Sequence, residues 1–149
     1  MFFPFEMYLC LQEDNEKHLM DCISHNLNID MIFPRDWKGE NEILSHRPSL
    51  LGMAAFYCAI KCFRLLIANG ATITTKDEAS TSIASFSAAG GSIDILTILN
   101  EFDVDFSNSL RYAAMYGKTE AFFWIYNNRF NQRELFQTIV LVKEVTSML

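Results

Sequence analysis

Apolar residues recur every three or four positions along much of the chain, which is the spacing of a helix with one buried face. The segment 60–68, IKCFRLLIA, shows this clearly, because Lys61 and Arg64 are the polar residues in an otherwise apolar stretch. The pair Asn69 and Gly70 follows it and forms a typical C-terminal stop. The pattern therefore predicts a helix that ends at this pair.

A shorter helix is predicted just before it, in the segment 49–58, SLLGMAAFYC. Ser49 is a residue type that caps helix N-termini. Ala54 and Ala55 have small side chains that allow two helices to approach closely. The unit is thus a short helix, a tight turn and a longer helix.

The same unit occurs again twice. Lys61 matches Asp94 at an offset of 33 residues, and Asp94 matches Glu120 at an offset of 26. The apolar segments CFRLLI, ILTILN and AFFWIY keep this register, and so do three predicted N-cap residues: Ser49, Ser82 and Asn108. Agreement of caps, small residues and apolar segments identifies a repeat protein.

Two helices per unit and a period of 33 residues resemble the ankyrin repeat. The segment 49–74 matches the ankyrin pattern at seven positions: Leu51, Ala54, Ala55, Leu65, Leu66, Gly70 and Ala71. The segment 113–126 matches it at Ala113, Ala114, Gly117 and Glu120. The repeats are degenerate, as in the ankyrin expansions of protists and large viruses: the usual Thr-Pro-Leu-His opening is absent, and Cys58 replaces the first hinge glycine.

The resemblance implies an all-α, ankyrin-type solenoid that forms a single domain. We expect a diverged first repeat at 1–32, with Leu19, Met20, Cys22 and Ile23 on its apolar face, and a long loop at 33–48. Three clear repeats follow at 49–76, 77–103 and 104–130. At 131–149 we expect a C-terminal capping helix, whose apolar side is formed by Leu135, Phe136, Ile139, Val140 and Val142.

In ankyrin arrays the two residues before each hinge, together with the tips of the finger loops, line the concave face. The resemblance therefore implies a partner-binding surface of eight residues: His46, Arg47, Phe56, Tyr57, Glu78, Thr81, Met115 and Tyr116. Ala89 and Gly90 hold the equivalent places in the middle repeat. We expect two aromatic ridges beside a shallow trough. The alternative is that Phe56 and Met115 pack against the long loop or the C-terminal helix.

Composition narrows the possible partners. The net charge is −6, and residues 1–40 hold eight acidic and three basic residues. A stripe of basic residues is absent, which argues against nucleic acid and anionic membranes as partners. The uncharged run 48–60 is too short for a membrane span, which needs about 20 residues. We find no targeting signal and expect a cytoplasmic protein, with a nuclear location as the alternative.

The four cysteines lie in apolar helical segments, at positions 10, 22, 58 and 62. We interpret them as small buried residues in a reducing compartment. Cys58 and Cys62 share one helical face, and histidines occur at positions 18, 25 and 46. A CxxC motif is missing, so we predict neither a metal site nor a cofactor.

The sequence contains no GxSxG, HExxH, P-loop or GxGxxG motif, so we predict a protein without enzymatic activity. The predicted function is protein–protein interaction through the concave face and the finger loops, by a chain that is a monomer. One alternative is a structural unit that associates with copies of itself. Another is a small enzyme that uses a Cys–His pair, for which Cys58 and His46 are the candidates.

Overall fold

The computed structural model describes residues 3–37, 41–130 and 132–148, and of residues 132–138 it describes the backbone alone. Helices dominate this part of the chain. The α-helices are α1 (Pro4–Gln12), α2 (Glu16–Ser24), α3 (Leu50–Phe56), α4 (Ile60–Ala68), α5 (Ile83–Gly90), α6 (Ile93–Leu99), α7 (Ser109–Met115), α8 (Thr119–Arg129) and α9 (Gln132–Ser147). A short 3-10 helix, η1 (Glu42–Leu44), precedes α3. None of the described helices is long and apolar enough to cross a membrane.

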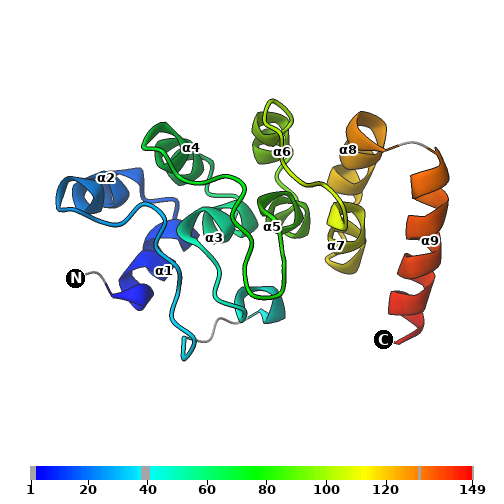
Figure 1. Ribbon diagram of the computed structural model, residues 1–149, viewed down its shortest axis with the longest axis horizontal. Coiled ribbons are helices and arrows are strands. Elements are labelled where there is room, and N and C mark those ends of the chain that lie inside the picture. Colours follow the sequence, from blue (N-terminus) through cyan, green and yellow to red (C-terminus); the bar gives the residue numbers. More distant parts are fainter. Residues whose placement is uncertain (1–2, 38–40, 131, 149) are drawn as a thin grey trace.

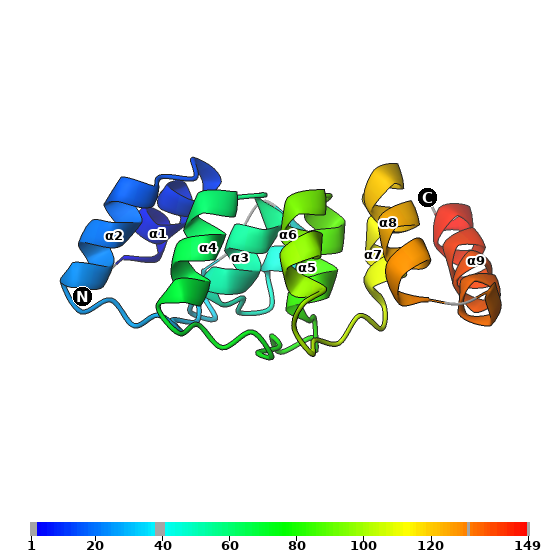
Figure 2. The same cartoon turned by 90° about the horizontal axis from the view of Figure 1, so that it is seen from above.

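The helices stack as four consecutive pairs. The first helix of each pair lies in one row, α1, α3, α5 and α7, and the second helix lies in the other row, α2, α4, α6 and α8 (Figure 1). Figure 2, which is turned by 90° from Figure 1, shows that the finger loops, which join successive pairs, lie along one side of the stack. The predicted all-α solenoid is confirmed.

Capping explains where most of the short helices begin. The Ser49 side chain accepts a hydrogen bond from the Gly52 backbone N–H, and Ser82 accepts one from Ser85, as the sequence predicts. Asn108 precedes α7 but makes no side-chain cap, and its backbone is left-handed, with φ 69°. The prediction that Asn108 caps its helix is therefore wrong, although its position is correct.

The hinges within the helix pairs share one backbone conformation. Cys58, Gly91 and Gly117 have φ values of 57°, 83° and 68°, all in the left-handed region that glycine favours. Asp14 has φ 51° at the corresponding hinge between α1 and α2. The chain thus keeps the turn even where a side chain makes this conformation less favourable.

The core runs between the helix pairs. It includes the apolar faces of α4 and α6, from Cys62 to Leu66 and from Ile95 to Leu99. In α2, Leu19 and Cys22 are buried as expected, but Met20 is 49 % exposed, so its assignment to the apolar face is wrong. The helix turns Met20 away from the core.

The first helix row and the C-terminal end of the stack are covered by different segments. The segment before α3 forms an antiparallel bridge between Ile32 and Ser49, and its η1, which lies beside the first row (Figure 1), buries Ile43 and Leu44. α9 packs against α7 at the C-terminal end (Figure 1). Of the residues expected on its apolar side, Ile139 and Val140 are exposed and Val142 is half-buried, while the side chains of Leu135 and Phe136 lie outside the described residues.

Candidate partner-binding surface

The aromatic residues of the predicted surface lie where the first-row helices end. Phe56 is the last residue of α3 and Tyr57 follows it as the C-cap. Met115 and Tyr116 hold the same two places in α7. α5 packs between these two helices, with contacts to both (Figure 1).

The rings form a continuous row across several repeats. The Tyr8 ring of α1 stacks on Tyr57, with centroids 5.7 Å apart and planes at 16°. Tyr57 meets Phe56 edge to face at 5.2 Å, and Phe56 meets Tyr116 edge to face at 5.9 Å. Offset and edge-to-face contacts of this kind are the favourable arrangements of aromatic rings. We call Tyr8, Tyr57, Phe56 and Tyr116 the aromatic row.

The contact between Phe56 and Tyr116 replaces the trough expected from the sequence. These residues come from helices on opposite sides of α5, and they meet because α5 ends in Ala89 and Gly90. A Cβ atom added to Gly90 would lie 2.3 Å from the Phe56 carbonyl oxygen, so the two backbones are already in close contact. The small residues therefore bring the two ridges together into one ridge.

Trp37 and Ile43, from the segment before α3, lie against the two ends of the aromatic row, Tyr8 and Tyr116. The Trp37 ring packs edge to face against Tyr8 at 5.6 Å and lies 4.8 Å from the ring of Phe33. Burial raises the pKa of the Tyr116 hydroxyl, and a hydrogen bond from the Ile43 backbone opposes this rise. Tyr8 is buried, and the other three rings of the row are half-buried. Met115, next to Tyr116 in the chain, is 42 % exposed and lines a small pocket with Val142 and Val145 of α9.

Charged residues tie the finger that contains Glu78 to the same segment. The Glu78 carboxylate accepts two hydrogen bonds from Arg35, at 2.9 and 2.7 Å, and lies 3.6 Å from Nη1 of Arg47. The Glu78 backbone N–H donates to the His46 carbonyl at 3.0 Å, and the His46 ring lies 3.2 Å from Glu42. His46, Arg47 and Glu78 thus lie together, as a solvent-accessible group held in place by each other.

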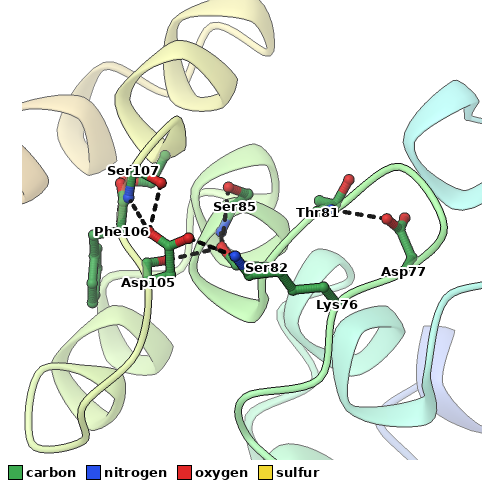
Figure 3. Close-up of polar contacts among 9 residues, drawn as sticks. Lys76, Asp77, Thr81, Ser82, Ser85, Asp105, Phe106 and Ser107 are labelled. Atoms are coloured by element: carbon green, nitrogen blue, oxygen red, sulfur yellow. Dashed lines mark hydrogen bonds and ion pairs between the residues drawn. The ribbon is translucent and has the colours of Figure 1, made fainter.

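Thr81 is placed differently from the other predicted residues, because it is only 3 % exposed. Its backbone N–H donates to Oδ1 of Asp77 at 2.8 Å, and the same oxygen accepts from Ala79 at 2.9 Å. Figure 3 shows Asp77 reaching back to Thr81 across the finger. Thr81 therefore shapes the finger turn from within instead of presenting its side chain to a partner.

The finger loop before α7 is joined through Asp105 to the finger loop before α5, which contains Glu78 and Thr81. Lys76 Nζ lies 2.7 Å from Asp105 Oδ2, and the Ser82 hydroxyl donates to the Asp105 carbonyl at 2.9 Å (Figure 3). Hydrogen bonds from Lys76 and Ser107 lower the pKa of Asp105 to about 2. The two fingers before α5 and α7 are thus joined into one edge of the surface.

Sequence reasoning missed three members of this arrangement: Tyr8, Arg35 and Trp37. The signal for Trp37 was present, because a loop that contains both Phe33 and Trp37 carries more apolar surface than a solvated loop retains. Arg35 offered no such signal, since its partner Glu78 is 43 residues away in the chain.

The Cys–His pair considered from the sequence gains no support from the geometry. The Cys58 thiol donates to the Gly90 carbonyl at 3.1 Å, and the His46 ring pairs with Glu42 instead. Desolvation raises the pKa of Cys58 against the opposing effect of Lys118. A raised pKa reduces the thiolate fraction, which is the opposite of what a nucleophilic cysteine requires.

Comparison with known proteins identifies the fold. The chain is similar to the crystal structure of the human ASB11 ankyrin repeat domain, with a TM-score of 0.70, 17 % sequence identity, and coverage of 99 % of this chain and 69 % of that one. No family model matches the sequence. No curated protein matches it either. The protein thus has the ankyrin-repeat fold, which the spacing of its repeats predicts.

Proposed function

Starting from the ankyrin-repeat fold, we propose that this protein is a non-enzymatic interaction module that binds a partner protein beside its aromatic row. Phe56, Met115 and Tyr116 form the apolar centre of the proposed contact. Its charged edge consists of His46, Arg47 and Glu78. Tyr57 stacks on Tyr8 and continues the row of rings, and Thr81 supports the adjoining finger, because it is buried.

The observation that carries this proposal is the exposure of Met115 next to a half-buried row of aromatic rings. Aromatic residues and methionine are enriched at the centres of protein interfaces, and polar residues surround them. The rings are held by edge-to-face contacts, so they would lose little conformational freedom when a partner covers them. Glu42, whose side chain is 84 % exposed, and His46 provide polar neighbours on the same side.

The proposal includes a monomer in the cytoplasm or nucleus. A partner with a phosphate backbone is disfavoured by the net charge of −6. The second candidate is association of the chain with itself. It is favoured by large apolar side chains outside the aromatic row, since Phe123 of α8 is 55 % exposed and Phe5 of α1 is 65 % exposed.

The experiment compares two substitutions that place the same charge on different faces. Met115→Glu puts a carboxylate beside the aromatic row, and Phe123→Glu puts one on α8. Both side chains are exposed, so both variants are expected to fold, which circular dichroism checks. Proteins captured by the wild-type chain from a cell lysate are expected to be lost with Met115→Glu and retained with Phe123→Glu.

Equal capture by both variants would exclude the surface beside the aromatic row. Loss with Phe123→Glu alone would place the contact on α8. Light scattering at increasing concentration separates the self-association candidate, because that candidate requires a mass that rises with concentration and falls back in the Phe123→Glu variant.

A further inference from the structure

Three residues with metal-binding side chains, none of them part of the aromatic row, meet at the N-terminal helix pair. They are Glu6 of α1 and His18 and Cys22 of α2. Glu6 Oε1 lies 2.8 Å from His18 Nε2 and 3.9 Å from Cys22 Sγ, and the sulfur lies 3.8 Å from the same His18 nitrogen. The three atoms thus form a small triangle of one oxygen, one nitrogen and one sulfur.

The local fold accounts for this triangle. His18 and Cys22 are four residues apart, so they lie on one face of α2. The Asn15 side chain accepts a hydrogen bond from the His18 backbone N–H and so fixes the first turn of α2. The left-handed hinge at Asp14 folds α1 back along α2, which brings Glu6, in the first turn of α1, opposite Cys22.

The triangle has the dimensions of a zinc site. With the usual bond lengths of Zn²⁺ to oxygen, nitrogen and sulfur, tetrahedral geometry separates two ligand atoms by roughly 3.4–3.6 Å. The two distances to the Cys22 sulfur, 3.8 and 3.9 Å, must shorten by a few tenths of an ångström, and the 2.8 Å distance between Glu6 and His18 must lengthen by about 0.6 Å. We propose that Glu6, His18 and Cys22 bind one Zn²⁺ ion.

The chemistry of the three groups favours zinc over calcium or magnesium. A thiolate and an imidazole are ligands for zinc, whereas calcium and magnesium prefer oxygen atoms. The Glu6 carboxylate and the Cys22 thiolate together balance the two positive charges of the ion. The side chains of Glu6 and His18 are both 37 % exposed, so the fourth position faces solvent and takes a water molecule.

Binding must release a proton from the thiol. An ordinary cysteine thiol has a pKa of about 8.5. The thiol is therefore protonated at neutral pH. The ion forms a bond to sulfur as the S–H bond breaks and the proton passes to solvent, so zinc affinity rises with pH.

The sequence alone points away from this site, to Cys58 and Cys62 as a pair on one helical face. That prediction is wrong, because Cys58 lies in the left-handed hinge before α4 and is exposed. Neither cysteine belongs to the cluster. His18 and Cys22 share the same spacing, but their carboxylate partner lies on another helix, 12 residues before His18. Only the packing of α1 on α2 brings the third ligand into place.

Cobalt provides the test, since Co²⁺ replaces Zn²⁺ in tetrahedral sites and absorbs light. We expect the reduced full chain to bind one Co²⁺, with a sulfur-to-metal charge-transfer band in the near ultraviolet and intense tetrahedral bands in the visible. Added Zn²⁺ should displace the cobalt and abolish both bands. Calorimetry with Zn²⁺ should show a proton release that depends on the buffer.

Matched variants assign the ligands. Cys22→Ser should abolish the charge-transfer band, and His18→Gln and Glu6→Gln should each weaken Zn²⁺ binding at least about 10-fold. Cys58→Ser and His25→Gln change the same residue types outside the cluster and should leave binding unchanged. Circular dichroism checks each fold, and His18 and Glu6 are sufficiently exposed for their variants to remain folded if Cys22→Ser does not.

Absence of cobalt or zinc binding by the wild-type chain would overturn the proposal. A charge-transfer band that persists in folded Cys22→Ser would also overturn it, because the sulfur ligand would then be another cysteine. Unchanged Zn²⁺ affinity in both His18→Gln and Glu6→Gln would likewise overturn the proposal. None of these results bears on the aromatic row, which shares no residue with the cluster.

Discussion

The helix pairs α5/α6 and α7/α8 have the same architecture but very different burial. α5 buries every residue from Ile83 to Ala89. α8 contains the more aromatic segment, AFFWIY, yet its fully buried residues are Ala121 and Ile125. Phe123 is 55 % exposed. Hydrophobic content therefore does not decide which helix forms the core of this molecule.

The number of neighbouring helices explains the difference. α5 lies between α3 and α7, whereas α8 packs against α6 and its own partner α7 in the last of the four pairs (Figure 1). Beside the contact between α7 and α9, an open pocket of about 280 Å³ remains between α9 and this last pair, lined by Phe122, Ile139 and Val142 among others. In a solenoid each repeat contacts only adjacent repeats, so the terminal pair is the less buried one.

Truncating one phenylalanine in each pair gives the largest expected contrast. Phe86 of α5 is 1 % exposed, so Phe86→Ala removes a fully buried ring and should lower the free energy of unfolding by about 3–5 kcal/mol. Phe123→Ala on α8 should lower it by less than about 1 kcal/mol, because most of that ring is already in water. Urea unfolding followed by circular dichroism measures both. Equal decreases in the free energy of unfolding for the two variants would show that the helix pairs α5/α6 and α7/α8 are equally buried.

A smaller contrast comes from adding one methyl group to each pair. Gly90→Ala places a Cβ 2.3 Å from the Phe56 carbonyl oxygen, a backbone atom that moves only with its helix. We expect this substitution to lower the free energy of unfolding by about 1–3 kcal/mol. Gly117→Ala meets nothing within 4 Å and carries only the strain of φ 68°, which is about 1 kcal/mol. Thermal unfolding of the two variants checks the order, and a larger loss for Gly117→Ala would contradict it.

The smallest expected effect concerns the ion pair between Lys76 and Asp105, which joins the finger loops before α5 and α7. Folding lowers the pKa of Asp105 to about 2, so its carboxylate stabilises the native state above its unfolded pKa of about 4. This contribution is lost as the pH falls from about 4 towards 2. Since the Asp105 side chain is 41 % exposed, Asp105→Asn should cost less than about 1 kcal/mol near neutral pH.

Urea unfolding of wild type and Asp105→Asn at several pH values measures this effect. The difference between the two proteins should shrink as the solution is acidified. A difference that stays constant down to the lowest pH would mean that the carboxylate charge contributes nothing to the joint between the fingers.

Much of the fold could be predicted from local sequence, because helices, caps and hinges depend on residues a few positions apart. Ser49 and Ser82 cap the helices that they were predicted to cap. Asn108 shows the limit, since it precedes α7 as predicted but has a left-handed backbone and makes no side-chain cap. The candidate surface is predicted by analogy of position, which places Met115 and Tyr116 at the end of a helix, where the structure has them, but could not show that Thr81 is buried.

The sequence by itself determined the repeat period, the helix pairs and the positions at the ends of α3 and α7, because each follows from contacts within one unit. Only the tertiary structure decided which of these side chains face water. The Phe56 ring reaches Tyr116 across α5, Arg35 reaches Glu78 across 43 residues, and Glu6 reaches Cys22 across the first hinge. Such contacts depend on how separate units stack, and no short-range pattern in the chain encodes that arrangement.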